Sequence, residues 1–197
     1  MQLREHRVTL QGTSVSLRPM TEDDWDILLK WHTDPEVLYY SEGEDVSSHN
    51  LQQVQYIYRY VSQNAFCFIT EYESKPIGEC SFQRVNLERI LHKNPGKDCR
   101  RIDLMIGEKQ IWGHGLGSDV IDVLTRFGFE DEQADLIFGC DIADYNPRSL
   151  KAFQNNGYRI DSKNKCSPGD KAEYNYDLII SRDDYYRKIS PQLKFRY

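Results

Sequence analysis

Apolar and polar positions alternate along the chain in a pattern typical of short strands interrupted by amphipathic helices. Strands are predicted where residues alternate or form short apolar runs, at residues 15–19, 65–72, 76–85, 101–107, 136–142 and 173–180. Helices are predicted at residues 21–34, 51–61 and 146–156, and in a segment that carries Leu116, Val120, Leu124 and Phe127 on one face. The order β-α-α-β-β-β-α-β-α-β-β, which has one more strand after the last helix than these ranges, indicates one mixed α/β sheet, partly antiparallel in its first half and with a parallel pair in its second.

Local signals mark the ends of several elements. Thr21 is the expected N-cap of the first helix, and acidic residues follow it in the first turn. Asn146 is the expected N-cap of a later helix, with Pro147 at its first position and Gly157 placed for a left-handed turn at its end. Residues 86–99 form an excursion between strands, and residues 181–197 form a polar tail that we expect to be peripheral.

Composition limits the possible classes of protein. The 197 residues suit one domain, 1–197, with a core at about 14–180. A net charge of −6 argues against a nucleic-acid partner. We expect no signal peptide and no membrane span, because apolar runs of those kinds are missing from the sequence. Five cysteines without CxxC spacing predict reduced thiols, a cytoplasmic location and no metal site.

Charge is unevenly distributed along the chain. Residues 21–45 carry nine acidic side chains and one lysine, whereas residues 89–101 are basic. The acidic segment either attracts a cationic substrate or is the solvated surface of helices.

The stretch "EKQIWGHGLGSDVI", residues 108–121, places Gly113, Gly115 and Gly117 between a predicted strand and a predicted helix. The first N–H groups of a helix have no intrahelical partners, and glycine lets an anion approach the backbone. Such a turn is therefore a candidate phosphate site, although an ordinary glycine-rich turn is the alternative. The run "GLGSD" lacks the Gly-Lys-Ser/Thr of a Walker loop, and Ser118 stands where GxGxxG needs glycine.

Residues 110–115 have the form Q/R-x-x-G-x-G/A and resemble the pyrophosphate loop of the GCN5-related N-acetyltransferases (GNAT family). The stretch "DYNPRSLKAFQNNGYRI" is similar to a second signature of that family, NxxAxxxYxxxGF, with Phe153 in place of the tyrosine and Tyr158 in place of the last phenylalanine. The resemblance covers residues 14–180. Two stretches resemble one subgroup of the family in particular, the aminoglycoside 6′-N-acetyltransferases. They are "LLKWHTDPEVLYYSEGED" and "IDLMIGEKQIWGHGLG". It implies a GNAT-like acyl-CoA N-acyltransferase fold whose sheet splays at the CoA-binding strand.

The resemblance also implies a binding site for acetyl-CoA. Its pyrophosphate is expected on Gln110, Ile111, Trp112, Gly113, His114, Gly115, Leu116, Gly117 and Ser118. Pantetheine is expected to pair with the edge of the strand at Leu104, Met105 and Ile106, where a backbone N–H near Met105 polarises the thioester carbonyl. Asn146 is expected to bind pantetheine, to cap its helix, or to do both, and Ser149 and Phe153 complete the expected cofactor site.

By the same resemblance, Asp103 is the general base that receives the proton of the substrate amine, because only a free amine attacks a thioester. The alternative is a structural ion pair with Arg100 or Arg101. Phe153 cannot protonate the departing thiolate. Water, Ser149 or Tyr145 takes that role, or no acid is needed, since thiol pKa values lie near 8–9.

The acceptor is expected to be a small cationic amine, an aminoglycoside first, held by Glu42, Glu44, Asp45 and Asp103. The basic residues 89–101 argue against a polycation, unless they serve the CoA phosphates or a dimer contact. A protein N-terminus, a lysine or a siderophore amine is an alternative acceptor, and a CoA-binding regulator without turnover is a third possibility. The chain is expected to be a monomer or a homodimer, and the aminoglycoside reading would connect it to antibiotic resistance.

Overall fold

The computed structural model describes residues 1–42 and 48–193 of the chain. Its strands are β1 (Leu10–Gln11), β2 (Val15–Pro19), β3 (Ala65–Tyr72), β4 (Lys75–Arg84), β5 (Cys99–Ile106), β6 (Leu136–Ala143), β7 (Arg159–Lys165) and β8 (Tyr174–Ser181). Its helices are α1 (Trp25–His32), α2 (Pro35–Ser41), α3 (Leu51–Val61), α4 (Glu88–Lys93), α5 (Leu116–Glu130), α6 (Pro147–Asn155) and α7 (Arg182–Leu193). In the described ranges, no helix combines the length and the apolar character that crossing a membrane requires.

The strands form one mixed sheet in the order β1-β2-β3-β4-β5-β6-β8-β7. Neighbouring strands are antiparallel except β5 and β6, which run parallel. This parallel pairing covers the start of both strands, from Cys99↔Leu136 to Arg101↔Phe138. Beyond Arg101 the described β5 pairs with β4 alone, so the sheet opens between β5 and β6, as predicted.

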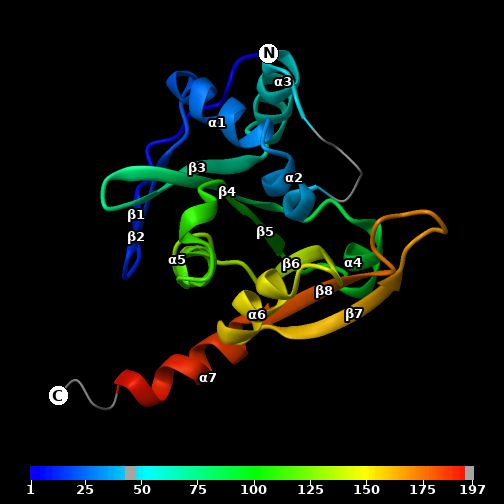
Figure 1. Cartoon of the computed structure of the whole chain (residues 1–197). Coiled ribbons are helices and arrows are strands. Elements are labelled where there is room, and N and C mark those ends of the chain that lie inside the picture. The colour runs from blue at the N-terminus through cyan, green and yellow to red at the C-terminus, as the bar shows by residue number, and fades with distance from the viewer. Residues whose placement is uncertain (43–47, 194–197) are drawn as a thin grey trace.

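Helices cover both faces of this sheet (Figure 1). On one face, α5 buries Val120, Leu124 and Phe127 against β2, β4 and β5, which confirms its predicted apolar face. On the other face, α1 and α3 cover one end, and Ile90 of α4 packs at the other end with residues of β5, β6 and β8. The odd-numbered residues of β5 between these two clusters include Arg101 and Asp103, which are polar.

The sequence predicts most of these elements, but not the short strand β1 or the helices α2, α4 and α7. The helix expected over 21–34 ends at His32, and a separate helix, α2, begins after Asp34. Asp34 caps α2 by accepting hydrogen bonds from Glu36 N (3.0 Å) and Val37 N (3.4 Å). The excursion contains the short helix α4.

The tail after residue 180 is expected to be peripheral, and its first part is a helix held to the domain by one buried side chain. Residues Arg182–Leu193 form α7, and Tyr185 on this helix is buried. The Tyr185 ring packs against Phe129, and its hydroxyl donates a hydrogen bond to Glu130 Oε1 (2.7 Å). One buried aromatic side chain therefore anchors an otherwise polar helix to α5.

Candidate active site

The turn from β5 to α5 is built from a 3₁₀ helix, Lys109–Ile111, followed by two left-handed glycines. Gly113 has φ 85° and Gly115 has φ 82°, a conformation that costs other residues about 1–2 kcal/mol. Gly115 is the N-cap of α5, so the unpaired N–H groups of the first helical turn and the positive end of its dipole lie directly after it. The indole N–H of Trp112 donates to Ile106 O (2.7 Å) and closes the turn onto β5.

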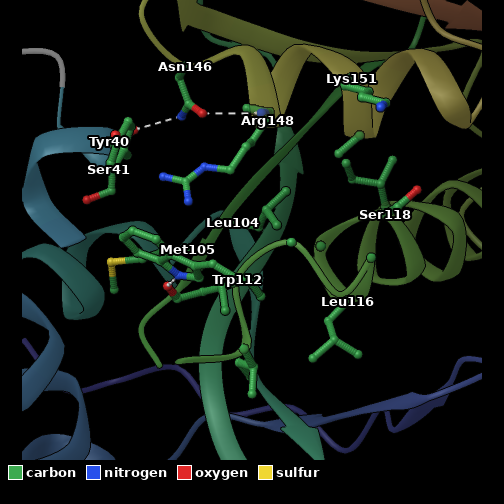
Figure 2. A pocket seen from close by; sticks show the side chains of 18 of the residues that line it. Tyr40, Ser41, Leu104, Met105, Trp112, Leu116, Ser118, Asn146, Arg148 and Lys151 are labelled. Atoms are coloured by element: carbon green, nitrogen blue, oxygen red, sulfur yellow. Dashed lines mark hydrogen bonds between the residues drawn. The ribbon is translucent and has the colours of Figure 1, made fainter. Parts of the chain in front are cut away.

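A cavity of about 500 Å³ lies against this turn (Figure 2). We call it the first cavity. Its walls come from β5, from the glycine turn with the start of α5, and from α6 and α2. Of the predicted cofactor residues, it is lined by Leu104, Met105, Ile106, Ile111, Trp112, Gly113, Gly115, Leu116, Gly117, Ser118, Asn146 and Ser149.

Three predicted cofactor residues lie outside the lining of the first cavity. Gln110 is exposed, and its side-chain amide donates to Glu108 Oε2 (3.0 Å). His114 is exposed. Phe153 is buried, with its ring against Tyr158 and close over the backbone of Gly139, and it lines a different cavity.

Arg148 is a feature of the first cavity that the sequence analysis missed. Its side chain extends from α6 into the cavity (Figure 2). The guanidinium carbon lies 4.4 Å from the ring centre of Tyr40 and 4.3 Å from that of Trp112. Arginine forms cation–π contacts and also pairs with phosphate, so a guanidinium here suits a phosphorylated ligand.

Asn146 has the predicted capping role and a second one. Its Oδ1 accepts from Ser149 N (3.2 Å), which caps α6, and its Nδ2 donates to Tyr40 O (3.1 Å) in α2 (Figure 2). One side chain thus ties together the two helices on opposite walls of the first cavity.

A second cavity, of about 440 Å³, adjoins the first. The two share six lining residues, which are Tyr40, Ser41, Leu104, Met105, Asn146 and Ser149. Leu104 and Met105 belong to the part of β5 that has parted from β6. The two cavities therefore meet where the sheet opens.

Asp103 lines the second cavity, and its two carboxylate oxygens have partners in the protein. Oδ2 accepts from Gln83 Nε2 (2.8 Å), and Oδ1 forms an ion pair with Arg101 Nη2. The ion pair anticipated as an alternative role for Asp103 is present, with Arg101 as the partner. The side chain remains partly exposed to the cavity, so the pair leaves the carboxylate within reach of a ligand.

Glu79, on β4, is a second carboxylate in this cavity and was missed by the sequence analysis. Burial, the nearby charge of Asp103 and that of Glu42 raise its pKa to about 8, against the effect of a hydrogen bond from Tyr58. The signal was present in the sequence. In the alternating strand "PIGECSF", Glu79 and Ser81 are polar residues two positions apart, which places them on one face of the sheet.

The structure describes some, but not all, of the acidic residues that are predicted to hold the acceptor. Glu42 lines the second cavity, whereas Glu44 and Asp45 lie outside the described residues.

The basic residues of segment 89–101 largely form ion pairs within the protein. Intramolecular ion pairs join Arg89 to Asp141 and Asp177, Lys93 to Asp161, Arg100 to Asp98 and Glu132, and Arg101 to Asp103.

Comparison with known proteins identifies a family and several solved structures with a similar fold. Residues 14–159 match the family model described as an acetyltransferase (GNAT) domain. A GNAT-family acetyltransferase structure from Bacillus anthracis has a TM-score of 0.72 at 16% identity, over 89% of this chain and 99% of that one. The structure of AAC(6′)-Ib with ribostamycin and coenzyme A has a TM-score of 0.71 at 20% identity, over 88% and 97%. Mycobacterium smegmatis RimJ with CoA-disulfide has a TM-score of 0.72 at 13% identity, over 94% and 95%.

Proposed function

The chain belongs to the GNAT acetyltransferase family, and from that premise we propose that it transfers an acetyl group from acetyl-CoA to a primary amine of a small cationic acceptor. The observation that carries the proposal is the junction of the two cavities at Leu104 and Met105. One cavity presents a helix N-terminus and an arginine, which suit phosphates. The other presents carboxylates, which suit an amine.

The residues of the first cavity fit coenzyme A. Left-handed Gly113 and Gly115 leave backbone N–H groups at the start of α5 open to a diphosphate, which is the usual basis of anion binding at helix N-termini. Arg148 adds a positive charge, and Leu104 and Ile106 supply an apolar wall for pantetheine. When bound, acetyl-CoA supplies an activated acyl group on a thiol that is a tolerable leaving group.

Asp103 is the proposed general base. A protonated amine entering the second cavity is attracted by its carboxylate and transfers a proton to it, and the free amine then attacks at the cavity junction. Backbone N–H groups of β5 near Met105 stabilise the negative charge that develops on the carbonyl oxygen. Arg101 and Gln83 hold Asp103 in position through the contacts described above.

Glu79 is the alternative base, and its raised pKa favours it. A carboxylate with a pKa of about 8 is a stronger base than an ordinary one and is matched to amine chemistry near neutral pH. The same value leaves Glu79 largely protonated at pH 7 until a cationic acceptor lowers the pKa. We therefore assign proton acceptance to Asp103 and a share in cation binding to Glu79.

No hydroxyl is available at position 153 to protonate the leaving thiolate. Ser149 lines both cavities, and Tyr145 lines the second, where its hydroxyl donates to Glu42 O (3.3 Å). The hydroxyl of Ser149 or of Tyr145 is better placed to reach the junction than the side chain of Phe153, which is buried. The proposal places the protonation of the thiolate on Ser149, on Tyr145 or on water.

The acceptor class follows from charge. Glu42, Glu79 and Asp103 converge on one cavity of about 440 Å³, which favours a molecule with several amino groups over a single neutral amine. The aminoglycosides are the first class to test, and AAC(6′)-Ib, one of the folds that this chain resembles, was solved with ribostamycin.

Release of free thiol from acetyl-CoA in the presence of an amine panel tests the proposal. The panel contains kanamycin, a linear polyamine, a peptide with a free N-terminus and a neutral monoamine. Turnover with the polycations at a kcat/KM well above that of the peptide and the monoamine supports it. Turnover on the peptide alone, or tight binding of coenzyme A with no turnover on any amine, overturns it.

A further inference from the structure

A compact group of three metal-ligating side chains lies at the edge of the second cavity. His32, Glu42 and His49 each offer one ligand atom, and these atoms lie within 4.8 Å of one another. His32 is the last residue of α1, Glu42 follows α2, and His49 precedes α3. His49 N donates to His32 O (2.8 Å), so a backbone hydrogen bond holds the two histidines together.

Two buried ring nitrogens in this group have no hydrogen-bond partner. They are Nδ1 of His32 and Nε2 of His49. His32 is 4% exposed, and a polar atom left unpaired at such a depth destabilises the folded state. His49 Nε2 lies 3.6 Å from Glu42 Oε1, which is longer than a hydrogen bond. The side chains thus point polar atoms at one another without satisfying them.

We propose that His32, Glu42 and His49 form a binding site for a divalent transition-metal ion of the zinc class. Two histidines and one glutamate are a known zinc-binding set in enzymes. Ligand atoms about 2 Å from a tetrahedral ion are about 3.3 Å apart. The 3.6 Å between His49 and Glu42 is close to that value, and the ligand atom of His32 lies within 4.8 Å of both.

The surroundings of His32 are those of a metal ligand. Its other nitrogen, Nε2, lies 2.8 Å from the hydroxyl of Tyr58, which fixes the orientation of the ring. The hydroxyl of Tyr58 also interacts with Glu79, and both residues line the second cavity.

Three protein ligands leave one tetrahedral position for water or a ligand, as in catalytic zinc sites. His32 and Glu42 line the second cavity, so a metal ion bound to them would lie beside the proposed acceptor site. The metal site does not depend on acetyl transfer, and its test uses no acceptor. The five cysteines are free, and their spacing gave no reason to expect a metal here.

Titration of the chelator-treated full chain with Co²⁺, followed by competition with Zn²⁺, tests the site. We expect one equivalent to bind, with the visible bands of a four- or five-coordinate Co²⁺ ion and no thiolate charge-transfer band. His49→Ala should raise the dissociation constant more than about a hundredfold, beyond the 10–100-fold typical of losing an outer partner. His92→Ala, at an exposed histidine of α4, is the matched control and should bind as the wild type does.

Glu42→Gln gives a second measure, because it removes one ligand charge without removing a ring from the protein interior. It should also weaken Co²⁺ binding, while the circular dichroism spectrum and coenzyme A affinity stay as in the wild type. Equal Co²⁺ affinity in the wild type, His49→Ala and Glu42→Gln overturns the site. A thiolate band or the lack of any stoichiometric binding does the same.

Discussion

Glu79 and Asp103 project from neighbouring strands onto the same face of the sheet, and both line the second cavity. Glu79 stands opposite Met105, and Asp103 lies two residues before Met105 on β5. The charge of Asp103 is one of the causes of the raised pKa of Glu79. The two carboxylates therefore differ, because Asp103 forms an ion pair with Arg101 and Glu79 tends to keep its proton.

Asp103→Asn should lower kcat by about 10²–10⁴-fold, the usual contribution of a general base, because the amide cannot take the proton from the amine. Affinity for coenzyme A should not change, since Asp103 does not line the first cavity. Steady-state kinetics with the best amine of the panel and calorimetry with coenzyme A measure the two effects. Asp161→Asn, which removes an ion pair with Lys93, is the control and should keep its activity. Unfolding of the Asp103 variant with an unchanged residual rate would show a structural role.

The pKa of Glu79 predicts how stability depends on pH. Between the ordinary pKa of 4.5 and the folded value of about 8, the folded state holds a proton that the unfolded state has lost. The stabilising contribution is therefore complete below about pH 4.5 and is lost as pH rises to about 8. Denaturant unfolding of the wild type and Glu79→Gln from pH 5 to 9 measures it. The wild type should lose stability relative to the variant across that window, and parallel curves would show that the pKa of Glu79 is not raised.

Two glycines of the turn allow a paired test of cofactor binding. A Cβ added at Gly117 would meet Leu104 at 3.5 Å, an ordinary contact, and alanine in a helix is more stable than glycine by about 0.5–1 kcal/mol. Gly117→Ala should therefore fold at least as well as the wild type but bind coenzyme A about tenfold more weakly, because its methyl group faces the first cavity. Thermal unfolding and calorimetry measure the two effects.

Gly115→Ala is the companion variant and should behave differently. Its φ of 82° is left-handed, so alanine there should lower both stability, by about 1–2 kcal/mol, and coenzyme A affinity. Unchanged coenzyme A affinity in both variants would place the diphosphate elsewhere.

Arg148→Ala should weaken the binding of coenzyme A about tenfold or more, which corresponds to the loss of a hydrogen bond to a charged group of about 1.5–3 kcal/mol. Binding of pantetheine, which lacks the phosphates, should change little. Calorimetry with both ligands separates a phosphate contact from a packing effect of the Tyr40 and Trp112 rings. An equal loss for both ligands would indicate packing alone.

The sequence predicts the parts of this molecule that depend on local chemistry. Residues close together in the sequence determine the glycine turn, the Asn146 cap and the apolar face of α5, and each has the predicted form. Two missed features had local signals. Asp34 followed by Pro35 marks the start of α2, and the polar residue in an apolar strand marks Glu79.

Other features depend on contacts between residues far apart in the chain. Arg148 lies between Tyr40 and Trp112, which are distant from it and from each other in sequence. The junction of the two cavities exists because pairing between β5 and β6 ends at Arg101 and Phe138. A motif places Asp103 near an amine by analogy, but its contacts with Gln83 and Arg101 appear only once β4 and β5 are paired.

A crystal structure of the chain with coenzyme A and kanamycin would show whether the two ligands meet at the cavity junction. We expect the diphosphate oxygens to lie within hydrogen-bond distance of backbone nitrogens at residues 113–118. We also expect one amino group of kanamycin to lie within hydrogen-bond distance of the Asp103 carboxylate and to point toward the junction at Met105. A diphosphate bound away from the start of α5, or an amine held by Glu79 with Asp103 still closed onto Arg101 and Gln83, would contradict it.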